Sequence, residues 1–360
     1  MNTKIYDWLM DNADAPIRYR VAREILKDEK AAKAIESELF NNLNIQKWLT
    51  NLKSHNPPQH HSMVHGSFDF CLENSMPKCA KLGLHGEMPQ MKEAAWLYLE
   101  RIKGKHNHKP VRELFNEILI ANFLTSAGYK DDDILKFMLK SLDVLYSFAK
   151  ENTYDIYLTS EERAKLKGVP KRWRDTEYFI FGKDIDEKGF YYPLVYDIIG
   201  LSGLYVLNDP ETDNKINTII KYISTDDFHE KISDGYGIIV VDSKYESGGS
   251  IYHGMGWDPK YPGWFDLEEF ANSRHMPKLL FYAEFAAKYP SARKTKWFAE
   301  LLSFLNHYKT DADTYIFPDK WLKESQGYAN QGHHMSFGEN RRKKVWCEIE
   351  STFYMQLLQQ

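Results

Sequence analysis

The sequence predicts an all-α fold of helical hairpins, and three observations carry that prediction. Apolar residues recur at helical spacing along most of the 360 residues. Pairs of such stretches repeat as units of about 35–40 residues, a period typical of helical repeat proteins. The longest β-like run is short and covers only Ile238-Ile239-Val240-Val241. Because no low-complexity linker divides the chain, we expect one domain over residues 1–360.

The first predicted helices precede the repeats. Ile17, Val21 and Ile25 recur at every fourth position after Pro16, which suits a first helical turn. Residues 31–52 carry a second series at roughly helical spacing, formed by Ile35, Leu39, Leu43 and Leu49. A polar segment that contains Pro57-Pro58 and His60-His61 then breaks the pattern. The sequence therefore predicts helical stretches before this break.

Four predicted hairpins follow, each with two helical stretches joined by a short turn. They cover residues 68–102, 111–149, 191–223 and 276–308, with turns near Gly83, Gly128, Asn208 and Tyr289. Acidic residues lie beside these turns, and the run Asp131-Asp132-Asp133 is the longest example. Helix capping and the helix dipole explain such acids at the start of a helix.

Two predicted insertions interrupt the hairpins. The first, at about 150–190, is highly charged and either attracts a phosphate or carboxylate or forms a solvated loop. Its basic residues are Arg163, Lys165, Lys167, Lys171, Arg172 and Arg174. The second, at about 232–266, is rich in glycine and aromatic residues. Long loops inside a compact domain are typical of functional segments, and the many rings favour an ordered loop.

Composition narrows the class of protein. Lys plus Arg is 47 and Asp plus Glu is 51, so the net charge of −4 argues against binding of nucleic acid. The three cysteines cannot all pair, and the N-terminus lacks the apolar stretch of a signal peptide. No window approaches the roughly 20 apolar residues of a membrane span. We therefore expect a cytoplasmic protein, with aromatic residues, at 14%, left to line a pocket.

The order of the hairpins and the opening residues resemble a known superfamily. Trp8-Leu9 and Ala15-Pro16-Ile17-Arg18-Tyr19-Arg20 resemble bacterial proteins of the terpenoid cyclase and protein prenyltransferase superfamily. The members labelled prenyltransferase or squalene-oxidase repeat proteins look closest. This resemblance implies an α/α toroid of roughly six hairpins, with inner helices around a central cavity and the aromatic, Gly-rich insertion added to it.

The catalytic motifs of that superfamily are incomplete in this chain. Asp311-Ala312-Asp313-Thr314 lacks the last acid of the Asp-x-Asp-Asp motif of squalene–hopene-type cyclases. Asp131-Asp132-Asp133-Ile134-Leu135 lacks the last acid of the magnesium-binding Asp-Asp-x-x-Asp motif. The segment 256–266 is similar to the Gly-rich segment before the zinc-binding Asp of protein prenyltransferases, but Glu268 stands where the family has Cys.

The strongest local candidate for a site is residues 252–275. Asp258, Asp266 and His275 are the predicted acid–base residues, because a carboxylate and an imidazole together transfer protons. The predicted substrate-binding residues are Tyr252, His253, Trp257, Trp264 and Arg274. An alternative interpretation is structural, since Asp266 and Glu269 have the spacing of a helix capping box.

Two histidine clusters are further candidates. His333 and His334 lie between Gly332 and Ser336, and they are predicted to assist catalysis, as bases or as metal ligands. Adjacent histidines point apart on a helix or strand, so one metal ion is an awkward partner for both. His60, His61, His65 and Asp69 have in part the spacing of metal ligands on one helix face, or else form a surface cluster. The sequence assigns no metal ligand and identifies no cofactor.

The preferred functional hypothesis is an enzyme with a small-molecule substrate. It would act by general acid–base chemistry on a largely apolar or isoprenoid-like molecule in the central toroid cavity. One alternative is a carbohydrate-active lyase or hydrolase on an α/α toroid. Another is a non-catalytic binding or scaffolding protein. The sequence leaves the oligomeric state open.

Overall fold

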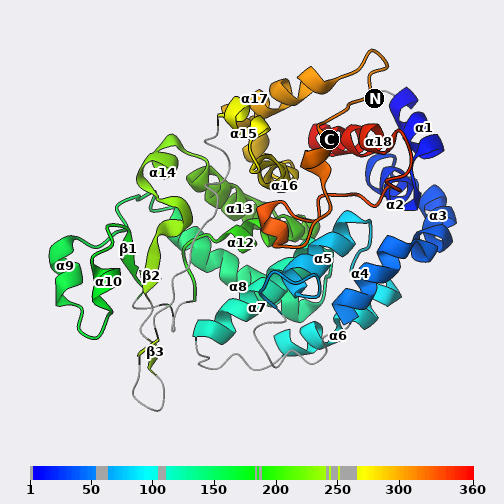
Figure 1. Ribbon diagram of the computed structural model, residues 1–360. Helices are drawn as coiled ribbons and strands as arrows, with labels where there is room; N and C mark the ends of the chain where they lie inside the picture. Colours follow the sequence, from blue (N-terminus) through cyan, green and yellow to red (C-terminus); the bar gives the residue numbers. More distant parts are fainter. Residues whose placement is uncertain are drawn as a thin grey trace. The chain divides into compact units, whose positions relative to one another are not determined.

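The computed structural model describes residues 3–53, 64–103, 111–182, 185, 189–240, 243–244, 250–251 and 266–360, and these residues are predominantly helical (Figure 1). The all-α prediction is therefore confirmed. The chain divides into two compact units. Unit 1 comprises Met1–Glu100, Ser126–Lys130 and Phe265–Gln360, and unit 2 comprises Arg101–Thr125 and Asp131–Trp264. Closure into a toroid, like the single domain, stays a prediction.

Unit 1 combines helices from both ends of the sequence. Its elements are α1 (Thr3–Asn12), α2 (Ala15–Arg20), η1 (Val21–Ile25), α3 (Glu29–Asn41), α4 (Leu43–Lys53), α5 (Leu72–Lys81), α6 (Pro89–Ile102), α15 (Leu267–Asn272), α16 (Met276–Ala286), η5 (Ala292–Lys294), α17 (Lys296–Leu305), η6 (Asn306–Tyr308), η7 (Asp319–Leu322), η8 (Ala329–Gln331) and α18 (Trp346–Gln359). The blue helices α1 and α2 lie close to the red helix α18 (Figure 1). Lys343 joins these ends, because its ammonium contacts Asp14 at 2.7 Å and the carbonyl of Asn12 at 2.9 Å.

Unit 2 contains a helical part and short strands. Its elements are α7 (Val111–Ser126), α8 (Asp132–Ala149), α9 (Ser160–Lys165), α10 (Lys171–Arg174), β1 (Phe179–Phe181), α12 (Val195–Leu201), η3 (Ser202–Leu207), α13 (Pro210–Ile223), α14 (Asp226–Lys231), η4 (Asp234–Tyr236), β2 (Ile238–Val240), β3 (Ser243–Lys244) and β4 (Ser250–Ile251). Strand β1 pairs with β2 in parallel, and β3 pairs with β4 antiparallel. The predicted β-like run thus forms β2 over most of its length.

The four predicted hairpins are present as helix–turn–helix units. They correspond to α5 with α6, α7 with α8, α12 and η3 with α13, and α16 with α17. Gly83 and Gly128 have φ values of 95° and 84°, so both turns use the left-handed region that glycine enters without strain. Asn208 has φ 50° and ends η3 in the same region. The turns are therefore where the sequence predicts them.

Two details of the N-terminal helices differ from the prediction. Residues 31–52 form two helices instead of one series, because the chain turns at Asn42, whose side chain accepts a hydrogen bond from the Asn44 amide at 2.9 Å. Leu43 consequently lies outside the core and is 80% exposed. Ile17, Val21 and Ile25 are buried as predicted, but the second half of their helix is the π-helix η1.

The predicted insertions belong to unit 2 where the structure describes them. The first contains α9, α10 and β1, which surround a small core of Val169, Phe179 and Val240. Its basic residues include Arg163, whose guanidinium donates to the carbonyls of Leu158 and Arg174 at 2.6 and 2.8 Å. The second contains η4 and β2 to β4. Among the helices that the structure describes, none has the length and apolarity needed to cross a membrane.

Candidate functional site

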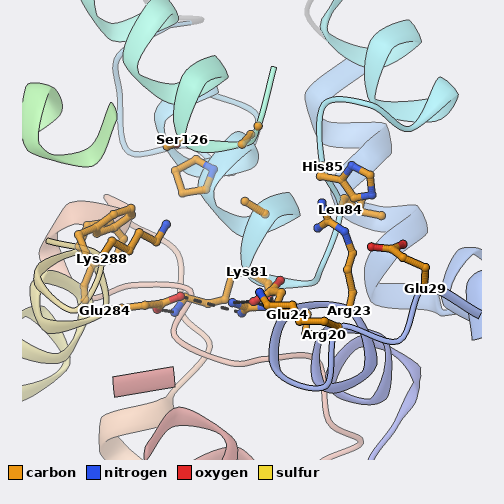
Figure 2. A pocket seen from close by; sticks show the side chains of 17 residues that line it. Arg20, Arg23, Glu24, Glu29, Lys81, Leu84, His85, Ser126, Glu284 and Lys288 are labelled. Carbon is orange, nitrogen blue, oxygen red and sulfur yellow. Dashed lines mark hydrogen bonds and ion pairs between the residues drawn. The ribbon is translucent and has the colours of Figure 1, made fainter. Parts of the chain in front are cut away.

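Unit 1 contains a charged pocket of about 490 Å³ (Figure 2). Residues from α2 and η1, from α5 and the turn after it, from the turn at Gly128, and from α16 and the turn after it line this pocket. The lining residues include Arg20, Arg23, Glu24, Lys27, Glu29, Pro77, Ala80, Lys81, Leu84, His85, Ser126, Phe281, Glu284, Phe285 and Lys288. The pocket thus brings together segments from both ends of the chain.

Three of the four walls share one residue spacing. The lining positions of these walls are spaced i, i+3, i+4, i+7, which is the spacing of one helix face. They are 20, 23, 24 and 27, then 77, 80, 81 and 84, and then 281, 284, 285 and 288. The last position of each set lies just beyond its helix. On an amphipathic helix that packs into a core, such a face is apolar. Here it carries arginine, lysine and glutamate in the middle. These charged positions distinguish the three walls from an ordinary apolar helix face, although the sequence alone does not show that they meet.

The first wall has an unusual backbone. Val21–Ile25 form a π-helix directly after α2, with hydrogen bonds from the Leu26 amide to the Val21 carbonyl and from the Asp28 amide to the Ala22 carbonyl, both 2.9 Å. Single π-helical turns occur frequently at functional sites, because the wider turn redirects side chains. This turn carries Arg23 and Glu24, which both line the pocket.

The floor of the pocket consists of two compensated ion pairs. Arg20 donates from Nε and Nη2 to the two oxygens of Glu24 at 2.9 and 2.8 Å, and from Nη1 to the Lys81 carbonyl at 3.0 Å. Lys81 forms an ion pair with Glu284. Burial opposes ionisation of Glu284, but Lys81 and Arg20 hold the pKa of its carboxyl below the usual value. The floor is therefore charged yet internally balanced.

Two cations at the wall lack such partners. Within the described residues, the side chains of Arg23 and Lys288 make no hydrogen bond and no ion pair. Lys288 is exposed to solvent, yet the surrounding walls partly dehydrate its ammonium and lower its pKa; Glu284 opposes this shift and Arg20 adds to it. In Figure 2 the two side chains lie on opposite sides, with Lys81 between them and Glu284 below Lys288.

The remaining charges leave the pocket positive. Five cationic side chains and three carboxylates line it. Two carboxylates, Glu24 and Glu284, belong to the floor pairs. The remaining charges are one carboxylate, Glu29, and three cations, Arg23, Lys27 and Lys288. None of these four side chains forms an ion pair in the described part of the chain. An anion is therefore the ligand that the uncompensated charge attracts.

His85 adds a neutral polar group to this wall. Its Nε2 atom lies 3.2 Å from the hydroxyl of Tyr19, whereas its Nδ1 atom is buried and has no hydrogen-bond partner among the described residues. Burial lowers the pKa of His85 to about 4, and the neighbouring Arg23 adds to the shift. His85 is therefore a neutral imidazole at neutral pH and does not contribute to the positive charge.

The predicted site at 252–275 is only partly described. Most of its predicted site residues lie outside the described residues, namely Tyr252, His253, Trp257, Asp258 and Trp264. Asp266, Arg274 and His275 are exposed. Their proposed roles stay predictions.

The described end of that segment shows a helix start. Asp266 is the N-cap of α15 and accepts hydrogen bonds from the Glu268 and Glu269 amides at 3.0 Å. His275 precedes α16, and its ring lies 5.7 Å from that of Phe270. The capping interpretation thus accounts for the contacts of Asp266 that the structure describes.

His333 and His334 lie in a loop that contacts α5. Nδ1 of His333 is 2.9 Å from the Ser325 hydroxyl. His334 is buried, and its Nε2 donates to the Gly327 carbonyl at 3.1 Å while its Nδ1 faces Glu324 at 3.4 Å. Although burial opposes it, Lys78 and His334 lower the pKa of Glu324 to about 2.

The third predicted cluster meets the second in the fold. Asp69 Oδ1 lies 3.7 Å from His334 Nε2, and His65 contacts Glu73 at 2.9 Å. His60 and His61 lie outside the described residues. Within the part of the chain that the structure describes, no group of three or more His, Cys, Asp or Glu side chains is arranged to hold a metal ion.

Comparison with protein-family models, with curated proteins and with solved structures finds no match to this chain.

Proposed function

We propose that this protein binds a small anionic molecule, one that carries a carboxylate or phosphate group, in the charged pocket of unit 1. The observation that carries the proposal is the contrast between floor and wall. The floor charges are paired with each other, whereas Arg23 and Lys288 line the same pocket without a hydrogen bond or an ion pair among the described residues. The Lys288 ammonium lies over the ring of Phe285, 4.9 Å from its centroid, and has no anionic partner there. A bound anion supplies the missing partner.

The chemistry of the wall supports an oxyanion in particular. The planar guanidinium of Arg23 offers parallel N–H donors that match a carboxylate or phosphate. The π-helical turn carries the Arg23 side chain beside the neutral His85, so Arg23 supplies the positive charge at this side of the pocket. The partly buried setting also strengthens the attraction, because fewer water molecules screen the charges.

This proposal differs from the expectation of an apolar or isoprenoid-like substrate. Most of the residues assigned to that substrate lie outside the described part of the chain, so the earlier expectation remains a competing proposal. The same experiment compares the two. A neutral isoprenoid alcohol and a neutral oligosaccharide serve as probes for the sequence-based alternatives, next to phosphate and short carboxylates.

The experiment is a binding measurement by calorimetry and thermal unfolding at low ionic strength. Anions should bind saturably and stabilise the protein, by about 2.7 kcal/mol at a hundredfold excess over Kd. Arg23→Gln should weaken binding by about 10- to 100-fold, the equivalent of one charged hydrogen-bond contact. Lys30→Gln removes an exposed cation outside the pocket and should leave binding intact. Equal affinity of R23Q and wild type would overturn the proposal.

A further inference from the structure

We infer that the ligand of this pocket is a dianion, with one anionic group held by Arg23 and the other by Lys288. This inference rests on the proposed function and specifies its substrate class. Two cations could share one anion only if they approached each other. In Figure 2 their side chains lie on opposite sides of the pocket.

The ion pairs of the floor exclude the simplest alternative role of Lys288, which is an ion pair with Glu284. Glu284 lies on α16 and Lys288 lies four residues later, in the turn just after that helix. Within a helix this is the spacing at which a glutamate and a lysine pair. Glu284 instead pairs with Lys81, which lies 203 residues earlier in the sequence. Lys288 is thereby left to face the pocket. An anion delivered by a ligand is the partner that the packing denies it.

The space between the cations indicates what joins the two anionic groups. Pro77, Ala80, Leu84, Phe281 and Phe285 contribute apolar surface to the same pocket. A short carbon chain contacts such surface favourably, whereas a second row of charges would lose its hydration there. The pocket volume of about 490 Å³ also suits a small molecule. The class is therefore a short carbon chain with a carboxylate or phosphate at each end.

The two ends differ in the anion that they suit. Arg23 presents a planar fork, which favours bidentate contact with a carboxylate or phosphate. Lys288 presents a compact ammonium, which acts as a point charge and donates to any nearby oxygen. Loss of Arg23 therefore removes both charge and orientation. Loss of Lys288 removes charge alone.

The test compares dicarboxylates with matched monocarboxylates by calorimetry. The probes are malonate, succinate, glutarate and adipate against acetate and butyrate, at constant ionic strength. The variants are Arg23→Gln, Lys288→Gln and the control Lys30→Gln. One chain length should bind the wild type at least about tenfold more tightly than its monocarboxylate. Lys288→Gln should reduce that affinity to the monocarboxylate level and leave monocarboxylate binding nearly unchanged.

The outcomes separate this inference from the proposed function. If monocarboxylates and dicarboxylates bind equally, and Lys288→Gln changes neither while Arg23→Gln abolishes both, the anion site stands and the dianion is wrong. If no anion binds the wild type, both are wrong. Circular dichroism of each variant confirms that the helices remain, so a loss of binding is assigned to the pocket.

Discussion

Replacing Asp197 by asparagine should remove a pH-dependent destabilisation from unit 2. Asp197 is buried in α12, where it accepts hydrogen bonds from the Leu194 amide at 2.8 Å and from Asn122 Nδ2 at 3.1 Å. Burial raises the pKa of its carboxyl from 3.8 to about 7, although these two hydrogen bonds oppose the shift. The folded protein therefore keeps a proton that the unfolded chain releases.

The sign and size of the effect follow from that difference. Between pH 3.8 and about 7 the folded state binds more protons than the unfolded state, so stability falls as the pH rises. The contribution of Asp197 to the free energy of unfolding is fully present below pH 3.8 and is lost as the pH rises through about 7. A shift of about three units, at about 1.4 kcal/mol each, amounts to about 4 kcal/mol.

Asparagine reproduces the neutral form without titrating. Its oxygen can accept from the Leu194 amide, and its Nδ2 can donate to Asn122 Oδ1, which has no hydrogen-bond partner among the described residues. Urea unfolding of wild type and D197N, followed by circular dichroism from pH 4.5 to 8, measures the difference in their free energy of unfolding. As the pH rises over this range, the difference should shift by several kcal/mol in favour of D197N. Asp133→Asn, an exposed change in the same unit, is the control. A difference in free energy of unfolding that stays constant with pH would refute the raised pKa of Asp197.

Three further predictions concern single residues. Glu350→Ala removes a fully buried carboxylate that accepts hydrogen bonds from two backbone amides, a hydroxyl and an arginine, so thermal unfolding should show a loss of about 3–5 kcal/mol. Gly200→Ala places a Cβ 2.1 Å from Asn122 Oδ1 and 2.6 Å from Asn122 Cα, and the melting temperature should fall by the equivalent of about 1–3 kcal/mol; an unchanged melting temperature would contradict the close packing there. Lys288, with its lowered pKa, should be acetylated at pH 7.5 faster than the exposed Lys30, as measured by peptide mass spectrometry; a rate equal to or below that of Lys30 would count against the pocket environment described.

Local patterns in the sequence predict the hairpins well, because helix spacing and turn residues act over a few positions. Gly83 and Gly128 mark turns by a conformation that depends on glycine itself. The break at Asn42 was not predicted, since Leu43 continues the apolar spacing even though it is exposed. The π-helix at Val21–Ile25 was not predicted either, because Ile17, Val21 and Ile25 are buried in either helical form.

The pocket could not be predicted from neighbouring residues. Arg23 and Lys288 come from opposite ends of the chain, and each alone is typical of a solvated helix surface. Only the fold shows that Glu284 is held by Lys81 and is thereby unavailable to Lys288. The sequence favours residues 252–275 because many reactive side chain types are adjacent there, whereas the side chains of the pocket come together through tertiary packing.

The discontinuous make-up of unit 1 has a consequence for biosynthesis. The π-helical turn near residue 23 cannot meet α16 until the ribosome has made the whole intervening stretch, including all of unit 2. At a translation rate of about 5–20 residues per second, the N-terminal helices spend seconds without α18, against which α1 packs. During that interval they are candidates for chaperone binding. The pocket is therefore complete only after the last stage of folding, and the anion that we propose as its ligand would favour that final step by mass action.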